Sequence, residues 1–125
     1  MTSTKKLGIW MDHSSAHLIE FNHETIETAV IHSDLANREN LSSSHNEDVI
    51  HNKEKQLQAG YFKKLSESIG TYDEVLLFGP TNAKSELYNI LKDDHHFDKI
   101  KFEIKQSDKL TENQQHAFVK EHFMN

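Results

Sequence analysis

The chain has 125 residues, of which 35% are hydrophobic and 27% are charged, as expected for one globular domain with an ordinary core. Its formal net charge of −6 at pH 7, with histidines neutral, disfavours broad electrostatic binding to nucleic acids. We therefore expect no DNA partner, although a local RNA-binding face is compatible with this charge. The absence of cysteine excludes disulfides, thiolate metal sites and cysteine nucleophiles.

The sequence contains no apolar run long enough for a membrane span. No stretch of about 18 apolar residues occurs, and the polar amino terminus lacks the apolar segment of a signal peptide. We therefore expect a cytoplasmic protein without a membrane partner.

The first part of the chain predicts an antiparallel meander. Residues 7–12, 16–21 and 24–32 have the apolar or alternating patterns of strands, and only short turns separate them. Residues 33–46 then hold few large apolar side chains and include three consecutive serines. We expect a mobile loop there, which is either a functional element or a solvated insertion.

The second part of the chain alternates helices with strands. The patterns predict a helix over 47–69, a strand over 74–78, a helix over 82–92, a strand over 99–105 and a last helix from residue 111. At the start of that last helix, Thr111 and Gln114 have the spacing of a capping box.

The element order β-β-β-α-β-α-β-α predicts an α/β fold. Alternating units at the carboxyl-terminal end favour parallel pairing of the last two strands, whereas the meander is antiparallel. We expect a five-stranded mixed sheet with flanking helices, similar to ribonuclease H-like folds, as a single domain over residues 1–125.

The junction after the fourth predicted strand is the strongest candidate site. Gly79 and Pro80 end an apolar strand, and a helix follows from about Thr81. Free backbone N–H groups at a helix start suit an anion such as an RNA phosphate, and Lys84 would assist. The structural alternative is a turn that needs Gly79 and Pro80 for its geometry, with Lys84 solvated.

This junction resembles a turn of a known family. The segment Gly79-Pro80-Thr81-Asn82 resembles the strand–turn–helix junction in the central domain of the archaeo-eukaryotic release factor and Pelota family, and residues 8–12 resemble the opening strand of that domain. The resemblance covers about residues 7–124. It implies the fold of that domain and a partner in translation: the ribosome, or ribosomal or transfer RNA.

One family motif is missing from the chain. The family's release factors hydrolyse peptidyl-tRNA through a Gly-Gly-Gln loop, and this chain has no two consecutive glycines. We therefore expect no catalytic residue of that kind. The chain resembles stand-alone bacterial release-factor-like proteins, which implies a role in stalling, rescue or hibernation.

Basic residues give the long predicted helix a second candidate surface. Lys53, Lys63 and Lys64 fall on one flank at about 100° per residue, and Arg38 and His45 of the loop could extend it. Such flexible cations suit phosphate contacts. The alternative is an ordinary solvated helix face.

Metal and cofactor sites have little support in the sequence. Asp12 ends the first strand, where ribonuclease H-like nucleases hold a metal-binding carboxylate, and Asp73 and Glu74 precede the fourth strand. The alternative is that Asp12 caps its own turn. The ten histidines are scattered without the spacing of a zinc site. We expect no metal and no cofactor.

The residues and the resemblance together predict a ribosome- or RNA-associated protein without enzymatic activity. Two other interpretations stay open: a metal-dependent nuclease that uses Asp12, and a protein–protein adaptor, which the acidic charge would suit.

Overall fold

The computed structural model of the chain describes residues 4–33 and 47–124, with side chains described from residue 56 onward in the second range. The elements in chain order are β1 (Lys6–Met11), β2 (Ser15–Asn22), β3 (Glu24–His32), α2 (Glu47–Ile69), β4 (Glu74–Gly79), α3 (Ala83–Lys92), the 3-10 helix η2 (His95–Phe97), β5 (Lys101–Gln106) and α4 (Glu112–Met124).

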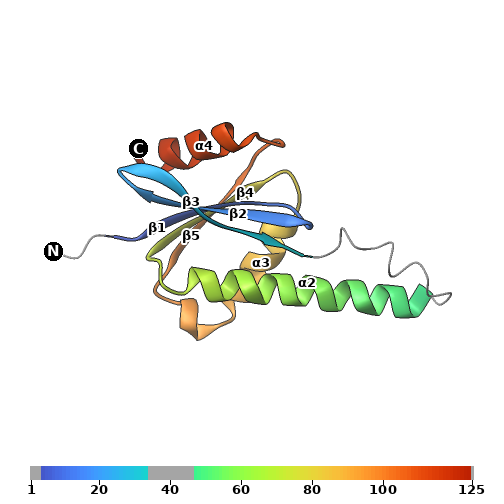
Figure 1. Ribbon diagram of the computed structural model, residues 1–125. Helices are drawn as coiled ribbons and strands as arrows, with labels where there is room; N and C mark the ends of the chain where they lie inside the picture. The colour runs from blue at the N-terminus through green and yellow to red at the C-terminus, as the bar shows by residue number, and fades with distance from the viewer. Residues whose placement is uncertain (1–3, 34–46, 125) are drawn as a thin grey trace.

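The strands form one mixed sheet in the order β3-β2-β1-β4-β5. The strands β1, β2 and β3 pair antiparallel, whereas β1, β4 and β5 pair parallel, which confirms the predicted fold class. Helices α2 and α3 cover one face of the sheet, and α4 lies on the other face (Figure 1). The sequence did not predict the short helix η2.

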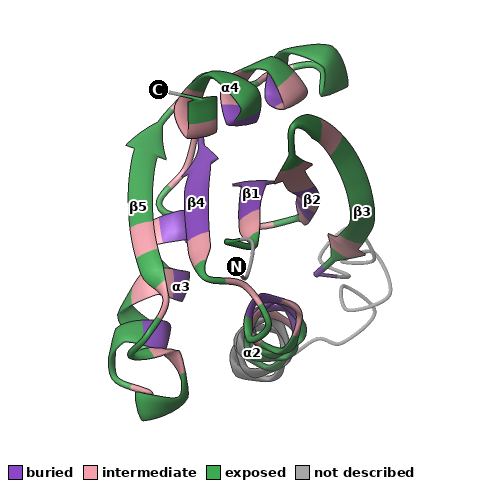
Figure 2. Ribbon diagram, turned by 90° about the vertical axis from the view of Figure 1, so that its left-hand side faces the viewer, coloured by how far each residue is buried: buried purple, intermediate pink, exposed green. Residues whose placement is uncertain are grey.

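Burial is concentrated in the two central strands. β1 and β4 are largely buried, while the edge strands β3 and β5 are mostly exposed (Figure 2). Alternation along β1 divides the core, because Leu7, Ile9 and Met11 join the cluster beneath α2 and α3, whereas Trp10 joins the cluster beneath α4. The sheet therefore has a hydrophobic core on each face.

Gly8 allows α4 to pack closely on β1. A β-carbon at Gly8 would overlap the side chain of Val119 on α4. Beside this contact, the rings of Phe78 and Phe118 stack at 4.5 Å between their centroids. The position of α4 thus depends on a strand residue without a side chain.

The pairing of β2 with β3 contains a bulge. Leu18 lies opposite Ala29, but Ile19 lies opposite Glu27, so that Thr28 is an extra residue in β3. Because successive strand residues alternate between faces, the bulge moves Glu27 to the face on which Ile19 lies. That is the face covered by α4.

The loop expected over residues 33–46 lies outside the described residues except for its first position. Ser33 is buried, and its backbone N–H donates to the Ser14 carbonyl oxygen at 2.9 Å. Arg38 and His45 are therefore not placed. Within the described ranges, no helix combines the length and apolar character that crossing a membrane requires.

Candidate functional site

The predicted anion-binding turn lies where β4 ends beside the end of β1. Gly79 has a φ of +151°, which residues with a side chain rarely adopt. A β-carbon there would also overlap the carbonyl oxygen of Met11 in β1. The close approach of two backbones is thus sufficient to explain the glycine.

The start of α3 follows this turn and carries its own acidic group. The N-cap residue Asn82 makes no side-chain capping bond, and the Thr81 hydroxyl accepts a hydrogen bond from the Ala83 N–H at 3.2 Å. Glu86 lies in the first helical turn, 2.7 Å from Nε2 of His13 in the β1–β2 turn. A carboxylate at this position interacts favourably with the helix dipole and opposes an external anion.

Lys84 is directed into the protein. Its side chain belongs to a residue only 3% exposed, and Nζ donates to the Thr81 carbonyl oxygen and, at 2.9 Å, to Oε1 of Gln106. Burial lowers the pKa of this ammonium group. The alternative in which Lys84 is solvated is wrong, because the ammonium joins the start of α3 to the end of β5.

Asp12 caps its own turn, as the structural alternative predicted. The backbone N–H groups of Ser14 and Ser15 donate to Asp12 Oδ1 at 2.7 and 2.9 Å. The Tyr61 hydroxyl of α2 donates to the Asp12 carbonyl oxygen at 2.9 Å, and burial of that hydroxyl raises the pKa of Tyr61. These bonds hold the middle of α2 at the end of the sheet where the central strands β1 and β4 terminate.

The carboxylates named for a nuclease site lie at opposite ends of the sheet. The parallel register of β1 and β4 sets Lys6 beside Glu74, whereas Asp12 follows the other end of β1. At ~3.3 Å per residue, six residues of strand separate these ends by roughly 20 Å. Asp73 instead accepts a hydrogen bond from the Lys5 N–H at 2.8 Å. Asp12 cannot share a metal ion with Asp73 or Glu74.

α2 presents two adjacent lysines to solvent. Lys63 and Lys64 are exposed, and in the described part of the chain neither lies within ion-pair distance of a carboxylate. Gly60 lies one turn earlier, and a β-carbon there would meet no atom within 4 Å. The side chain of Lys53 lies outside the described residues. The helix thus offers two exposed cations without a carboxylate partner among the described residues, with open space beside Gly60.

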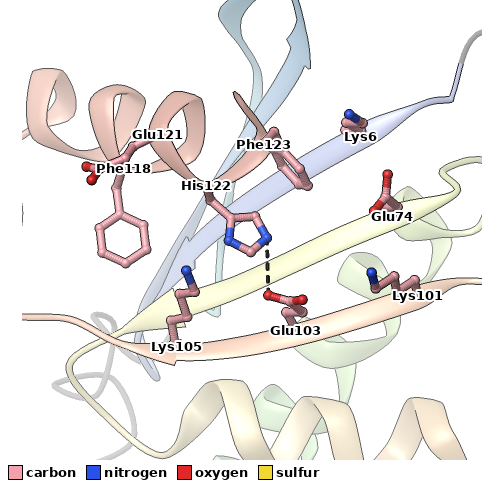
Figure 3. Close-up of a pocket in the computed structure, with 9 residues that line it drawn as sticks. All are labelled: Lys6, Glu74, Lys101, Glu103, Lys105, Phe118, Glu121, His122 and Phe123. Atoms are coloured by element: carbon pink, nitrogen blue, oxygen red, sulfur yellow. Dashed lines mark ion pairs between the residues drawn. The ribbon is translucent and has the colours of Figure 1, made fainter. Parts of the chain in front are cut away.

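A pocket that the sequence did not predict lies between α4 and strands β1, β4 and β5 (Figure 3). It encloses about 490 Å³. Its lining consists of three lysines, three glutamates, two phenylalanines and one histidine: Lys6, Lys101, Lys105, Glu74, Glu103, Glu121, Phe118, Phe123 and His122.

The charges of this pocket balance. Within the described residues its lysines form no ion pair, and His122 Nε2 lies 3.4 Å from Oε2 of Glu103. Desolvation, together with the nearby Lys105 ammonium, lowers the pKa of His122. With equal numbers of lysines and glutamates, the pocket offers no excess charge to select an anion.

The part of the pocket lining that comes from β5 could be predicted from the sequence. Lys101, Glu103 and Lys105 alternate along β5 and so share one face of that strand. The other half of the lining comes from α4, and its placement depends on the strand order and on packing at Gly8. Local patterns carry no information on either point.

Comparison with known proteins identifies the fold. No protein-family model matches the chain, and no curated protein sequence matches it. The structure is similar to Pelota from Thermoplasma acidophilum, with a TM-score of 0.64 and 11% identity over 93% of this chain. It is similar to Pelota from Archaeoglobus fulgidus with the same TM-score and 8% identity over 97% of this chain.

In both comparisons the chain spans 32% of the Pelota chain. The likeness therefore covers almost the whole of this molecule and about a third of each Pelota. The resemblance inferred from residues 79–82 is confirmed at the level of the fold: the chain has the mixed five-stranded α/β architecture of a Pelota domain.

Proposed function

We propose that the chain is a translation-associated protein that binds the ribosome or its RNA and performs no peptidyl-tRNA hydrolysis. The observation that carries this proposal is the extent of the fold likeness, since 93–97% of the chain superimposes on Pelota. The sequence resemblance implies the ribosome as partner and stalling, rescue or hibernation as the process.

The non-enzymatic part of the proposal rests on the sequence and on the position of Asp12 in the sheet. The four glycines of the chain are isolated at positions 8, 60, 70 and 79, so no Gly-Gly-Gln segment exists. A nuclease mechanism based on Asp12 would need a second carboxylate nearby, but Asp73 and Glu74 lie at the opposite end of the sheet. Among the described residues, neither the Gly-Gly-Gln mechanism nor a metal site at Asp12 has the set of side chains that it requires.

We assign the RNA contact to the end of the sheet where β1 and β4 terminate. Tyr61 binds the Asp12 turn, which fixes the middle of α2 beside the ends of β1 and β4. Lys63 and Lys64 supply exposed cations there, and Lys53, Arg38 and His45 would extend this basic surface. The turn of Gly79, Pro80 and Thr81 would add hydrogen-bond donors such as the Thr81 hydroxyl, with Lys84 supporting it from within, although Glu86 opposes an anion at this helix start.

Charge reversal on α2 tests this assignment. Lys63→Glu/Lys64→Glu should weaken co-sedimentation with purified ribosomes, and each lost phosphate contact should reduce the magnitude of the salt slope by roughly 1. Both side chains are exposed, so the free energy of unfolding should change by less than about 0.5 kcal/mol.

A matched control separates local contact from total charge. Lys99→Glu/Lys109→Glu changes the net charge equally at two other exposed positions and should leave co-sedimentation unchanged. Equal losses in both double variants would show that only the overall charge matters. No loss in either, from a chain that co-sediments when unmodified, would favour the adaptor interpretation.

A further inference from the structure

Three metal-ligating side chains from three elements meet on the face of the sheet covered by α4. They are His17 of β2, Glu27 of β3 and Glu112, the first residue of α4. Their candidate ligand atoms all lie within 4.8 Å of one another, and His17 Nδ1 lies 3.4 Å from Oε2 of Glu27. In sequence these residues are far apart, which is why spacing alone predicted no metal site.

The bulge in β3 is what brings Glu27 to this position. Beyond the bulge Glu27 lies opposite Ile19, and Ile19 shares its face with His17 two residues earlier. With regular pairing, Thr28 would lie opposite Ile19 and Glu27 would point to the face of α2. The irregular pairing thus places a carboxylate beside an imidazole.

In the described part of the chain, His17 is the basic side chain beside the two carboxylates, and no lysine or arginine joins it. Among the described residues, no lysine or arginine forms an ion pair with Glu27 or Glu112. The side chains of His17 and Glu27 are 19% and 30% exposed, so solvent screens the Glu27 carboxylate incompletely, whereas Glu112 is exposed. Two carboxylates this close repel each other, and a bound divalent cation would remove that repulsion.

Neighbouring contacts hold the three elements in place. One helical turn after Glu112, His116 Nδ1 lies 2.8 Å from the Thr25 hydroxyl of β3. On the sheet side, the His17 ring packs edge-on against Trp10, with 5.8 Å between centroids. Trp10 is 4% exposed, and its indole N–H has no hydrogen-bond partner among the described residues.

We propose that His17, Glu27 and Glu112 bind a divalent transition-metal ion of the zinc class. One imidazole nitrogen and two carboxylate oxygens suit Zn²⁺, Co²⁺ or Ni²⁺ better than Mg²⁺ or Ca²⁺, which prefer oxygen ligands alone. Three protein ligands leave a coordination position for water. The ion would join the start of α4 to β2 and β3 and so hold that helix on the sheet.

The single tryptophan of the chain provides the assay, because it contacts His17. Titration with Ni²⁺ should quench the fluorescence of Trp10 in a saturable manner, and Zn²⁺ should reverse this quenching by competition. Zn²⁺ should also raise the melting temperature, because an ion held by three elements binds the folded state preferentially. In His17→Ala and in Glu112→Gln, the Ni²⁺ midpoint should rise at least tenfold.

His95→Ala is the matched control. His95 has a side chain that is 96% exposed, and its helix η2 packs through Phe97 against the core on the opposite face of the sheet. Its loss should leave the Ni²⁺ midpoint unchanged. Glu112→Gln removes an exposed side chain at a helix start, so it keeps the test valid if His17→Ala perturbs folding. Non-saturable quenching, or equal midpoints in the unmodified chain and Glu112→Gln, would overturn the proposal.

Discussion

Two glycines of this protein differ in the space that surrounds their α-carbons, and this difference predicts opposite effects of alanine substitution. A β-carbon at Gly8 would overlap the side chain of Val119, whereas one at Gly60 would meet no atom within 4 Å. Gly8→Ala should therefore destabilise the fold by about 1–3 kcal/mol through overpacking. Gly60→Ala should stabilise it by up to about 1 kcal/mol, because alanine favours a helix interior. Urea unfolding of both variants measures these changes, and a shift of the same sign in both would contradict the packing of α4 on β1.

The lowered pKa of His122 gives a prediction about pH. Because desolvation and Lys105 hold the folded-state pKa below its usual value, the unfolded chain binds a proton at this position more readily. The free energy of unfolding that neutral His122 contributes is therefore complete above about pH 6.5, and it is lost as the pH falls from there through the folded-state pKa. His122→Gln removes this contribution.

Urea unfolding at pH 7.5 and pH 5 compares the two proteins. The unmodified chain should lose more free energy of unfolding than His122→Gln between these values, since all other groups titrate in both. A greater loss in the variant would show that the Glu103 partner dominates instead.

Among the elements, α4 shows how a local motif sets a boundary. The backbone N–H of Thr111 donates to Oε1 of Gln114 at 2.9 Å, and the N–H of Gln114 donates to the Thr111 hydroxyl at 3.3 Å. This confirms the predicted capping box. Thr111→Ala should cost about 1 kcal/mol of stability by urea unfolding. Thr71→Ala, at an exposed position in a turn, is the control, and an equal cost in both would mean that the box contributes nothing.

Elements were predictable where local patterns determine them. The helix over 47–69 and the strand over 24–32 have the predicted bounds, and the other predicted boundaries agree within two residues. Asp12 likewise caps its turn by accepting hydrogen bonds from the backbone N–H groups of Ser14 and Ser15, two and three residues later. Such features depend on contacts that are close in sequence.

Sites that depend on sheet order were not predictable in this way. The pocket needs α4 above β5, and the cluster of His17, Glu27 and Glu112 needs the bulge at Thr28. For Lys84, its position in the helix pattern did not reveal that Gln106, 22 residues later, would accept its hydrogen bond. Tertiary pairing decides each of these cases.

At the scale of the whole molecule, the proposed function rests on two observations, the likeness of the fold to part of Pelota and the lack of a Gly-Gly-Gln segment. The chain spans about a third of the archaeal Pelota structures and superimposes on that part over nearly its full length. Isolated glycines leave no Gly-Gly-Gln segment. The claim to test is our proposal that the chain associates with the translation apparatus and releases no peptide.

The most direct measurement of this claim is sedimentation of the purified chain with ribosomes that carry labelled peptidyl-tRNA. At low salt, the chain should appear in the ribosome pellet while the labelled peptide stays on its tRNA, and raising the salt should move the chain to the supernatant. A chain that remains in the supernatant at low salt, or that releases the peptide, would contradict the account.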